Sequence, residues 1–208
     1  MAERPPTLLS RLVKAVLLWL YRWKHWEVEG EAPRSPKALL LGAPHTSNWD
    51  FIFFLGVTQS FGLRQRFMGK TSLFKWPLTR FMYDMGGVPI DRSQRNNYVD
   101  QVVAAIKNAP RDFHLVIAPE GTRGMIDKWR SGFYHIAHGA GVPIVPAWVD
   151  HASMRGGIGP EIPTTGDFLA DLKKIADFYR SKMPNHPKLA KLYAMVDFGG
   201  DSGGEKPE

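Results

Sequence analysis

His45 and Asp50 are the residues whose types and spacing most directly suggest chemistry, and they lie in LLLGAPHTSNWDFIFFLG, between two apolar runs. If a helix begins near residue 46 or 47, Asp50 in its first turn can orient one imidazole nitrogen of His45. The other nitrogen is then available as a base, as in an oriented histidine–carboxylate pair. Ser47 and Asp50 also have the spacing of a capping box, in which the carboxylate only stabilises the start of the helix. The pattern alone leaves both interpretations open.

The apolar runs on either side of His45 predict the elements that position it. The first predicts a buried strand over residues 37–43, and the second predicts a helix over residues 47–61. The remaining predicted elements are short strands at 65–68 and 88–91, strands in FHLVIAPEG and VPIVPAWVD, and helices at about 72–85, at 132–139, in NNYVDQVVAAIKNAP and in DFLADLKKIADFYRSKM. This alternation predicts an α/β fold with a mostly parallel sheet flanked by helices. His45 directly follows a strand, where such folds bind ligands.

The cysteine content, the length of the apolar runs and the net charge of the chain exclude some classes of protein function. The chain has 208 residues, a formal net charge of +7 and no cysteine. The lack of cysteine excludes a disulfide scaffold, a thiol nucleophile and a cysteine zinc site. No apolar run reaches the roughly 18 residues of a membrane-spanning helix. The positive charge indicates an anionic partner: nucleic acid, an acidic membrane surface or a phosphorylated substrate.

Residues 1–26 are expected to form an amphipathic membrane-associating helix. The segment LLSRLVKAVLLWLYRWKHW combines an apolar face, basic residues on the opposite side and three tryptophans, as interfacial helices do. The alternative is a helix that packs on the core of the protein itself. The apolar positions at helical spacing are Leu9, Leu12, Val13, Val16, Leu17, Leu20 and Trp23.

Three further segments follow the His-x4-Asp pair in order: GGVPIDR, APEGTRG and VPIVPAW. With these four blocks, residues 39–148 resemble the glycerolipid acyltransferases typified by 1-acylglycerol-3-phosphate acyltransferase. The resemblance implies an acyltransferase domain over residues 27–195, between the helix of residues 1–26 and a flexible tail at 196–208 whose composition is typical of disorder.

The resemblance also assigns site residues. It implies that His45 is the catalytic base and Asp50 its orienting carboxylate. It further implies that the second and third blocks bind the phosphorylated acceptor, and that Arg130 in WRSG replaces a lysine of the family. The substrate-binding residues predicted in this way are Arg92, Glu120, Gly121, Thr122, Arg123 and Arg130. Arginine suits this role because its planar fork donates two parallel hydrogen bonds to a phosphate.

A basic stretch over residues 64–80 carries interleaved aromatic residues. No nucleic-acid-binding motif accompanies it, so we expect a membrane or substrate-phosphate surface, with Lys70 as the best single phosphate ligand. His135 and His138 have the spacing of a metal pair on a helix, but no third ligand is suitably spaced, so packing is the expected role. We therefore expect neither a metal nor a bound cofactor.

The implied reaction moves a fatty acyl group from acyl-CoA or acyl carrier protein to the hydroxyl of a lysophospholipid, namely 1-acylglycerol-3-phosphate in phospholipid biosynthesis. A thioester is already activated, so no acyl-enzyme is needed, in keeping with the absence of cysteine and of a Gly-x-Ser-x-Gly motif. The expected location is peripheral, on the cytoplasmic face of a membrane. The alternatives are another lysolipid or an amino-acid lipid as acceptor, a histidine-dependent lipid hydrolase, and a non-catalytic lipid-binding module.

Overall fold

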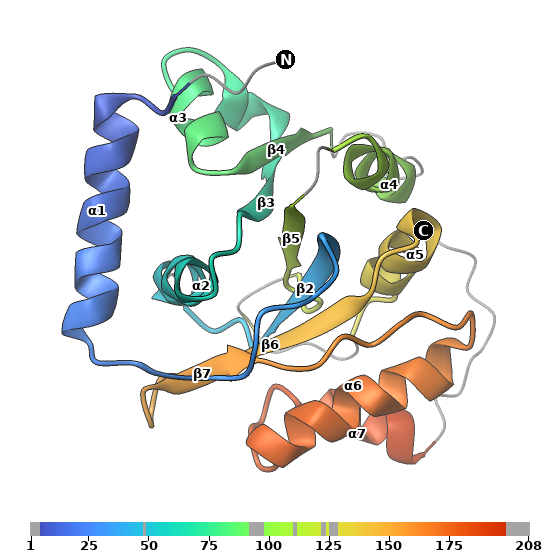
Figure 1. The fold of residues 1–208 in the computed structure, drawn as a ribbon. Coiled ribbons are helices and arrows are strands. Elements are labelled where there is room, and N and C mark those ends of the chain that lie inside the picture. Colours follow the sequence, from blue (N-terminus) through green and yellow to red (C-terminus); the bar gives the residue numbers. More distant parts are fainter. Residues whose placement is uncertain are drawn as a thin grey trace.

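The computed structural model describes residues 5–47, 49–91, 98–109, 112–121, 124 and 129–198. In these residues a seven-stranded sheet has the order β1-β7-β6-β2-β5-β3-β4 (Figure 1). Neighbouring strands are parallel except β6 and β7, which are antiparallel. The strands are β1 (Glu27–Glu29), β2 (Lys37–Ala43), β3 (Gln65–Lys70), β4 (Gly87–Ile90), β5 (Phe113–Ile117), β6 (Ile144–Asp150) and β7 (Arg155–Ile158). The predicted α/β fold with a mostly parallel sheet is confirmed.

Helices cover both faces of this sheet. They are α1 (Leu8–Trp23), α2 (Trp49–Ser60), the 3-10 helix η1 (Thr71–Phe74), α3 (Thr79–Asp84), α4 (Tyr98–Asn108), α5 (Gly132–Ala140), α6 (Phe168–Lys182) and α7 (Ala190–Asp197). Strand β2 lies between two core clusters: Leu39 and Leu41 belong to the cluster with α4, α5, α6 and α7, whereas Leu40 packs on the side of α1 and α2. Because both faces are buried, β2 is a continuous apolar run, and its predicted bounds agree with the structure.

The prediction of one helix over residues 72–85 is wrong. The segment divides into η1 and α3, and residues 75–78 between them contain Pro77. Proline has no backbone N–H to continue a helix and disfavours helical backbone in the residue before it, which accounts for the break. Strands β1 and β7 and helix α7 were not predicted. Residues 199–208 of the predicted flexible tail lie outside the described residues.

Helix α1 is docked on the core at both ends. The ring of Tyr21 packs edge-on against Phe53 of α2, with centroids 6.3 Å apart, and lies so close to Gly56 that an added Cβ would be 2.3 Å from it. At the other end, the hydroxyl of Ser10 donates to Oδ2 of Asp84 at 2.8 Å, which joins α1 to α3. The alternative that this helix packs on the protein's own core is therefore correct for one of its faces.

The opposite face of α1 is apolar and exposed. We define the α1 stripe as the exposed residues Leu8, Leu9, Leu12, Val16, Trp19 and Trp23. Trp19 and Trp23 stack with centroids 6.3 Å apart. Val13, Leu17 and Leu20 were expected on the same outward face, and this expectation is wrong, because all three are half-buried. In the part of the chain that the structure describes, no helix combines the length and hydropathy needed to cross a membrane.

Candidate active site

The site lies where parallel strands end. Strands β6, β2, β5 and β3 are adjacent and parallel, so their carboxyl ends meet at one edge of the sheet. His151 follows β6, His45 follows β2 shortly after Ala43, Glu120 follows β5, and Lys70 ends β3. The strand-end position predicted for His45 is therefore shared by side chains from three neighbouring strands.

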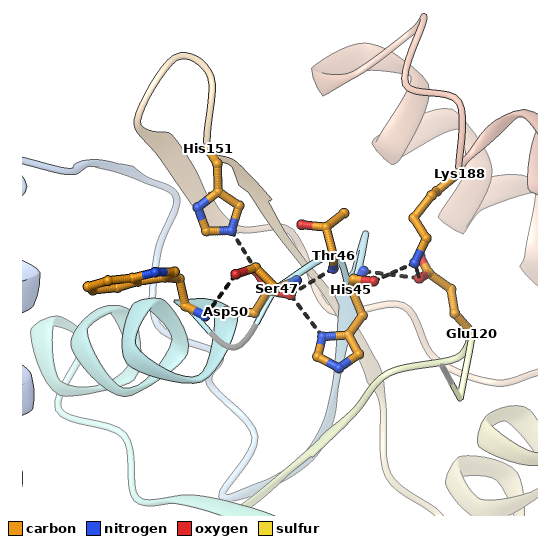
Figure 2. A network of polar contacts seen from close by, with 8 residues as sticks. His45, Thr46, Ser47, Asp50, Glu120, His151 and Lys188 are labelled. Carbon is orange, nitrogen blue, oxygen red and sulfur yellow. Dashed lines mark hydrogen bonds and ion pairs between the residues drawn. The ribbon is translucent and has the colours of Figure 1, made fainter. Parts of the chain in front are cut away.

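His45 and Asp50 form the predicted pair. Nδ1 of His45 lies 2.8 Å from Oδ2 of Asp50 (Figure 2). The same carboxylate oxygen accepts hydrogen bonds from the backbone N–H groups of Thr46 at 2.8 Å and Ser47 at 2.9 Å. Asp50 thus both caps the start of α2 and orients the imidazole, so the two interpretations of the sequence pattern hold together. Since Nδ1 is engaged, Nε2 is the nitrogen left to act as a base, and the His45 side chain is 28% exposed.

The second oxygen of Asp50 contacts another histidine. Nε2 of His151 lies 2.6 Å from Oδ1 of Asp50, on the side opposite His45 (Figure 2). Burial alone raises the pKa of Asp50, but hydrogen bonds from His45, His151 and the two backbone N–H groups outweigh it and lower this pKa to about 2. The carboxylate is therefore ionised at neutral pH. An ionised carboxylate only accepts hydrogen bonds, so each imidazole nitrogen facing it carries a proton.

A buried ion pair between Glu120 and Lys188 forms hydrogen bonds with the backbone of His45. Oε2 of Glu120 accepts hydrogen bonds from the His45 N–H at 3.1 Å and from Nζ of Lys188 at 2.7 Å. Lys188, between α6 and α7, also donates to the His45 carbonyl oxygen, and both charged side chains are buried. Burial raises the pKa of Glu120, and the hydrogen bond and charge of Lys188 act in the opposite direction. The pair therefore fixes both polar backbone groups of His45.

The other predicted binding residues are only partly described. Gly121 ends a turn in which its N–H donates to the carbonyl oxygen of Ala118 at 3.1 Å, and its φ of +66° lies in the left-handed region that favours glycine. An added Cβ at Gly121 would lie 3.9 Å from Nε of Arg130, so these two predicted residues are neighbours. Lys70 is exposed at the end of β3, paired in register with Ile90 of β4. Arg92, Thr122 and Arg123 lie outside the described residues.

An apolar pocket of about 190 Å³ lies beside His151. Its walls come from the last turn of α1, the first turns of α2 and the segment after β6. They are mainly aromatic and aliphatic, with the Lys24 side chain the one cation among the described lining residues. Trp26 packs on Phe53 within this wall, with centroids 4.7 Å apart. The pocket can therefore take up an apolar group next to the carboxylate that orients His45.

His151 and Lys188 were not among the residues predicted from the sequence. A signal existed for His151, because it directly follows the predicted strand VPIVPAWVD, as His45 follows its own strand. Lys188 belongs to no motif, and only the tertiary structure brings it to His45. The histidines of α5 have packing contacts: His138 stacks on Tyr134 at 6.0 Å and its Nδ1 lies 3.2 Å from Oγ1 of Thr164. Among the described residues no group of three potential ligands is placed to hold a metal ion.

The sequence model of the Acyltransferase family matches residues 25–150. The chain belongs to the Acyltransferase family. The family resemblance drawn from the four sequence blocks is thereby confirmed. His45, Asp50 and Glu120 lie within the matched residues, whereas His151 and Lys188 lie beyond them.

Similar family members include three 1-acyl-sn-glycerol-3-phosphate acyltransferases. The Saccharomyces cerevisiae protein is 31% identical over 134 residues, which cover 61% of this chain and 43% of the relative. The Salmonella typhimurium protein is 30% identical over 119 residues, covering 54% and 47%. The chloroplastic protein of Brassica napus is 28% identical over 133 residues, covering 61% and 38%. Each match thus spans less than half of the relative's own length.

The fold is also found in a solved structure of the family. The crystal structure of the 1-acyl-sn-glycerophosphate acyltransferase PlsC from Thermotoga maritima is similar with a TM-score of 0.56 and 17% identity. The similarity covers 86% of this chain and 80% of that structure, so it extends well past the segment matched by the family. At this identity the likeness establishes a shared fold.

Proposed function

We propose that this protein is an acyltransferase that moves a fatty acyl group from acyl-CoA or acyl carrier protein to the hydroxyl of a lysophospholipid, 1-acylglycerol-3-phosphate. The observation that carries the proposal is the His45–Asp50 pair at the carboxyl ends of the strands, which leaves Nε2 of His45 accessible. Membership of the Acyltransferase family supports the reaction type. The names of the relatives support the acceptor.

In the proposed mechanism, Nε2 of His45 removes the proton from the acceptor hydroxyl as the hydroxyl oxygen attacks the thioester carbonyl carbon. A C–O bond forms, the C–S bond breaks, and the proton passes from His45 to the leaving thiolate, so the products are an ester and a free thiol. Asp50 keeps His45 in the tautomer with Nδ1 protonated and stabilises the imidazolium that forms during transfer. Because the thioester is already activated, no covalent enzyme intermediate is required.

The basic residues at the strand ends are proposed to bind the acceptor phosphate. Lys70 ends β3 and pairs in register with Ile90, which precedes Arg92 by two residues in the sequence. Arg130 lies beside Gly121 in the third block, which also contains Arg123. Arginine and lysine are the side chains that recognise phosphate, arginine by paired parallel hydrogen bonds and lysine as a point charge.

The α1 stripe is proposed to dock the protein on the cytoplasmic face of a membrane. Its large apolar side chains are exposed, and Trp23 and Lys24 place an aromatic ring and a cation at the end of α1 next to the pocket. Tryptophan and lysine are common at the lipid–water interface. The pocket gives the acyl chain of a docked lysolipid an apolar place beside Asp50.

The test is acyl transfer by the purified protein from labelled palmitoyl-CoA, and separately from palmitoyl-acyl carrier protein, to a panel of lysolipids. We expect free thiol to be released only when an acceptor is present, and mass spectrometry to identify phosphatidic acid as the product. Thiol release without an acceptor would identify a hydrolase instead. No release with any donor and acceptor would leave a lipid-binding module as the function.

A further inference from the structure

We propose that His151 is a positioning residue, which holds the Asp50 carboxylate in the orientation that His45 requires. The inference rests on the proposed acyltransferase function. The two carboxylate oxygens of Asp50 have different partners. Oδ2 is held by His45 and by two backbone N–H groups, whereas the contact of Oδ1 comes from His151, 101 residues away in the chain.

Asp50 needs this second contact because it is buried and charged. Its side chain is 2% exposed, so water does not replace a missing hydrogen bond to Oδ1. A buried ionised oxygen without a donor is costly, and the carboxylate can relieve that cost by rotating. Rotation would turn Oδ2 away from Nδ1 of His45. The hydrogen bond from His151 therefore keeps Oδ2 aimed at the base.

His151 is itself fixed in place. Its ring packs edge-on against Trp26, with centroids 5.3 Å apart and an interplanar angle of 77°. The turn that carries it is held by Asp150, which accepts hydrogen bonds from the Ala152 N–H at 3.0 Å and from the Ser153 hydroxyl at 2.6 Å. The imidazole thus lies between the Trp26 ring and the carboxylate.

The ring geometry separates the roles of the two histidines. His45 directs Nδ1 to Asp50 and leaves Nε2, the nitrogen farther from its own backbone, for the substrate. In His151 the two nitrogens are exchanged. Nε2 contacts Asp50, and the remaining nitrogen is Nδ1, which lies close to the main chain of His151 itself. His45 is therefore the base, and His151 acts through Asp50.

Two substitutions separate the hydrogen bond of His151 from its ring. His151→Phe keeps a ring against Trp26 and removes the donor, whereas His151→Gln removes the ring and keeps an N–H at a similar distance from the main chain. We expect His151→Phe to lower kcat by about 10- to 100-fold, because a hydrogen bond to a charged group is lost where it affects the transition state. The KM of both substrates should change little, since the pocket wall is kept. His151→Gln should recover most of the lost kcat.

The matched control is His135, an exposed histidine on α5 that also contacts an aromatic ring. His135→Phe and His135→Gln should leave kcat unchanged. Thermal melting of each variant shows whether the fold is kept, and His151→Leu, which also lacks the donor, gives the same test if His151→Phe is unstable.

Each outcome has a definite meaning. Wild-type kcat in His151→Phe, or a lower kcat in His151→Gln than in His151→Phe, would overturn the proposal, because the ring and not the hydrogen bond would then matter. No acceptor-dependent thiol release by the wild-type protein would instead refute the proposed function, and full activity in His45→Ala would refute His45 as the base. The two failures are therefore distinguishable.

Discussion

The Nδ1 atom of His45 and the Oδ2 atom of Asp50 lie 2.8 Å apart. His45 lies in the loop that joins strand β2 to helix α2, and Asp50 lies in the first turn of α2. The hydrogen bond therefore crosses the junction that also places the site at the edge of the sheet. Because backbone N–H groups at the start of α2 bind the same oxygen, helix capping and base orientation depend on one carboxylate.

His45→Ala should lower kcat by at least about 100-fold, the usual effect of removing a general base. Asp50→Asn should be similarly severe, because an amide can donate as well as accept and so permits the wrong imidazole tautomer. Steady-state kinetics with an acyl thioester and a lysolipid measure both effects. Circular dichroism should show a folded protein in each case, and a folded His45→Ala variant with wild-type kcat would disprove the mechanism.

The ionisation of Asp50 should appear in the acid stability of the protein. Its pKa of about 2 in the folded state lies below the ordinary value of 3.8, so the ionised form stabilises the fold above about pH 4. This stabilisation is lost as the pH falls from about 4 through 2, and amounts to about 2 kcal/mol in the free energy of unfolding.

Urea unfolding of the wild type and Asp50→Asn at pH 7 and at pH 2 isolates this contribution, because the amide does not titrate. The stability difference between the two proteins should shrink by about 2 kcal/mol at the lower pH. A difference that does not change with pH would show that the Asp50 pKa is the same in the folded and unfolded states.

Lys188→Met should destabilise the protein by about 3–5 kcal/mol, because it leaves the buried Glu120 carboxylate without its cation. The double variant Lys188→Met/Glu120→Gln should lose less than the sum of the single variants, since no uncompensated charge remains. Urea unfolding gives the three free energies. The exposed Lys191, on α7, provides the control, and Lys191→Met should be close to neutral. Strict additivity of the two single variants would show that the ion pair is not coupled.

Trp19→Ser combined with Trp23→Ser should strongly reduce co-sedimentation with vesicles of phosphatidylglycerol and phosphatidylcholine. The two rings are exposed and stacked on the α1 stripe, so they can insert into a membrane. Full burial of each large apolar side chain contributes about 1.5–3 kcal/mol to the free energy of binding. Higher salt should weaken, without abolishing, the binding of the unsubstituted protein.

Point substitutions suit this test better than deletion of residues 1–26, because Tyr21 and Trp26 pack in the core. Leu169→Gln changes an exposed apolar residue of α6 and should leave vesicle binding unaltered. If the tryptophan variant sediments as well as the unsubstituted protein, the membrane contact lies elsewhere, and the basic stretch over residues 64–80 becomes the next candidate.

Arg92→Ala and Arg123→Ala should raise the KM for a phosphorylated acceptor more than the KM for the acyl donor, because both arginines are predicted to bind the acceptor phosphate. Lys70→Ala and Arg130→Ala should act in the same direction. Initial rates with each substrate varied in turn separate the two constants. A raised donor KM with an unchanged acceptor KM would mean that these residues bind the donor instead.

The parts of the fold that were predictable are those in which local pattern and burial agree. Residues 38–43 carry no polar side chain because β2 is covered on both faces, so the strand could be predicted from its composition alone. Strand β7 could not, because it contains Gly156 and Gly157 in place of apolar residues. Tertiary contacts explain both glycines: added Cβ atoms would lie 2.1 Å from Cζ of Phe53 and 2.1 Å from the carbonyl oxygen of Glu29, respectively.

The contact between His45 and Asp50 was predictable because the two residues are close in sequence and have the spacing of an oriented histidine–carboxylate pair. Their supporting residues were not, since His151 and Lys188 are single residues whose roles depend on the sheet order and on the packing of the C-terminal segment. The sequence also indicated an amphipathic α1. It did not indicate which of the apolar residues of this helix, Tyr21 among them, would face α2.

The contact between Lys188 and His45 has a consequence for biosynthesis. A chain is made from its N-terminus, so β2 and the loop that carries His45 are synthesised long before Lys188. Until Lys188 has been synthesised, Glu120 cannot form the ion pair with it, and the carbonyl group of His45 lacks the hydrogen bond from it. A nascent chain that has already formed β2 and β5 therefore lacks the donor to the His45 carbonyl group and the cation beside Glu120 until residue 188 has been added.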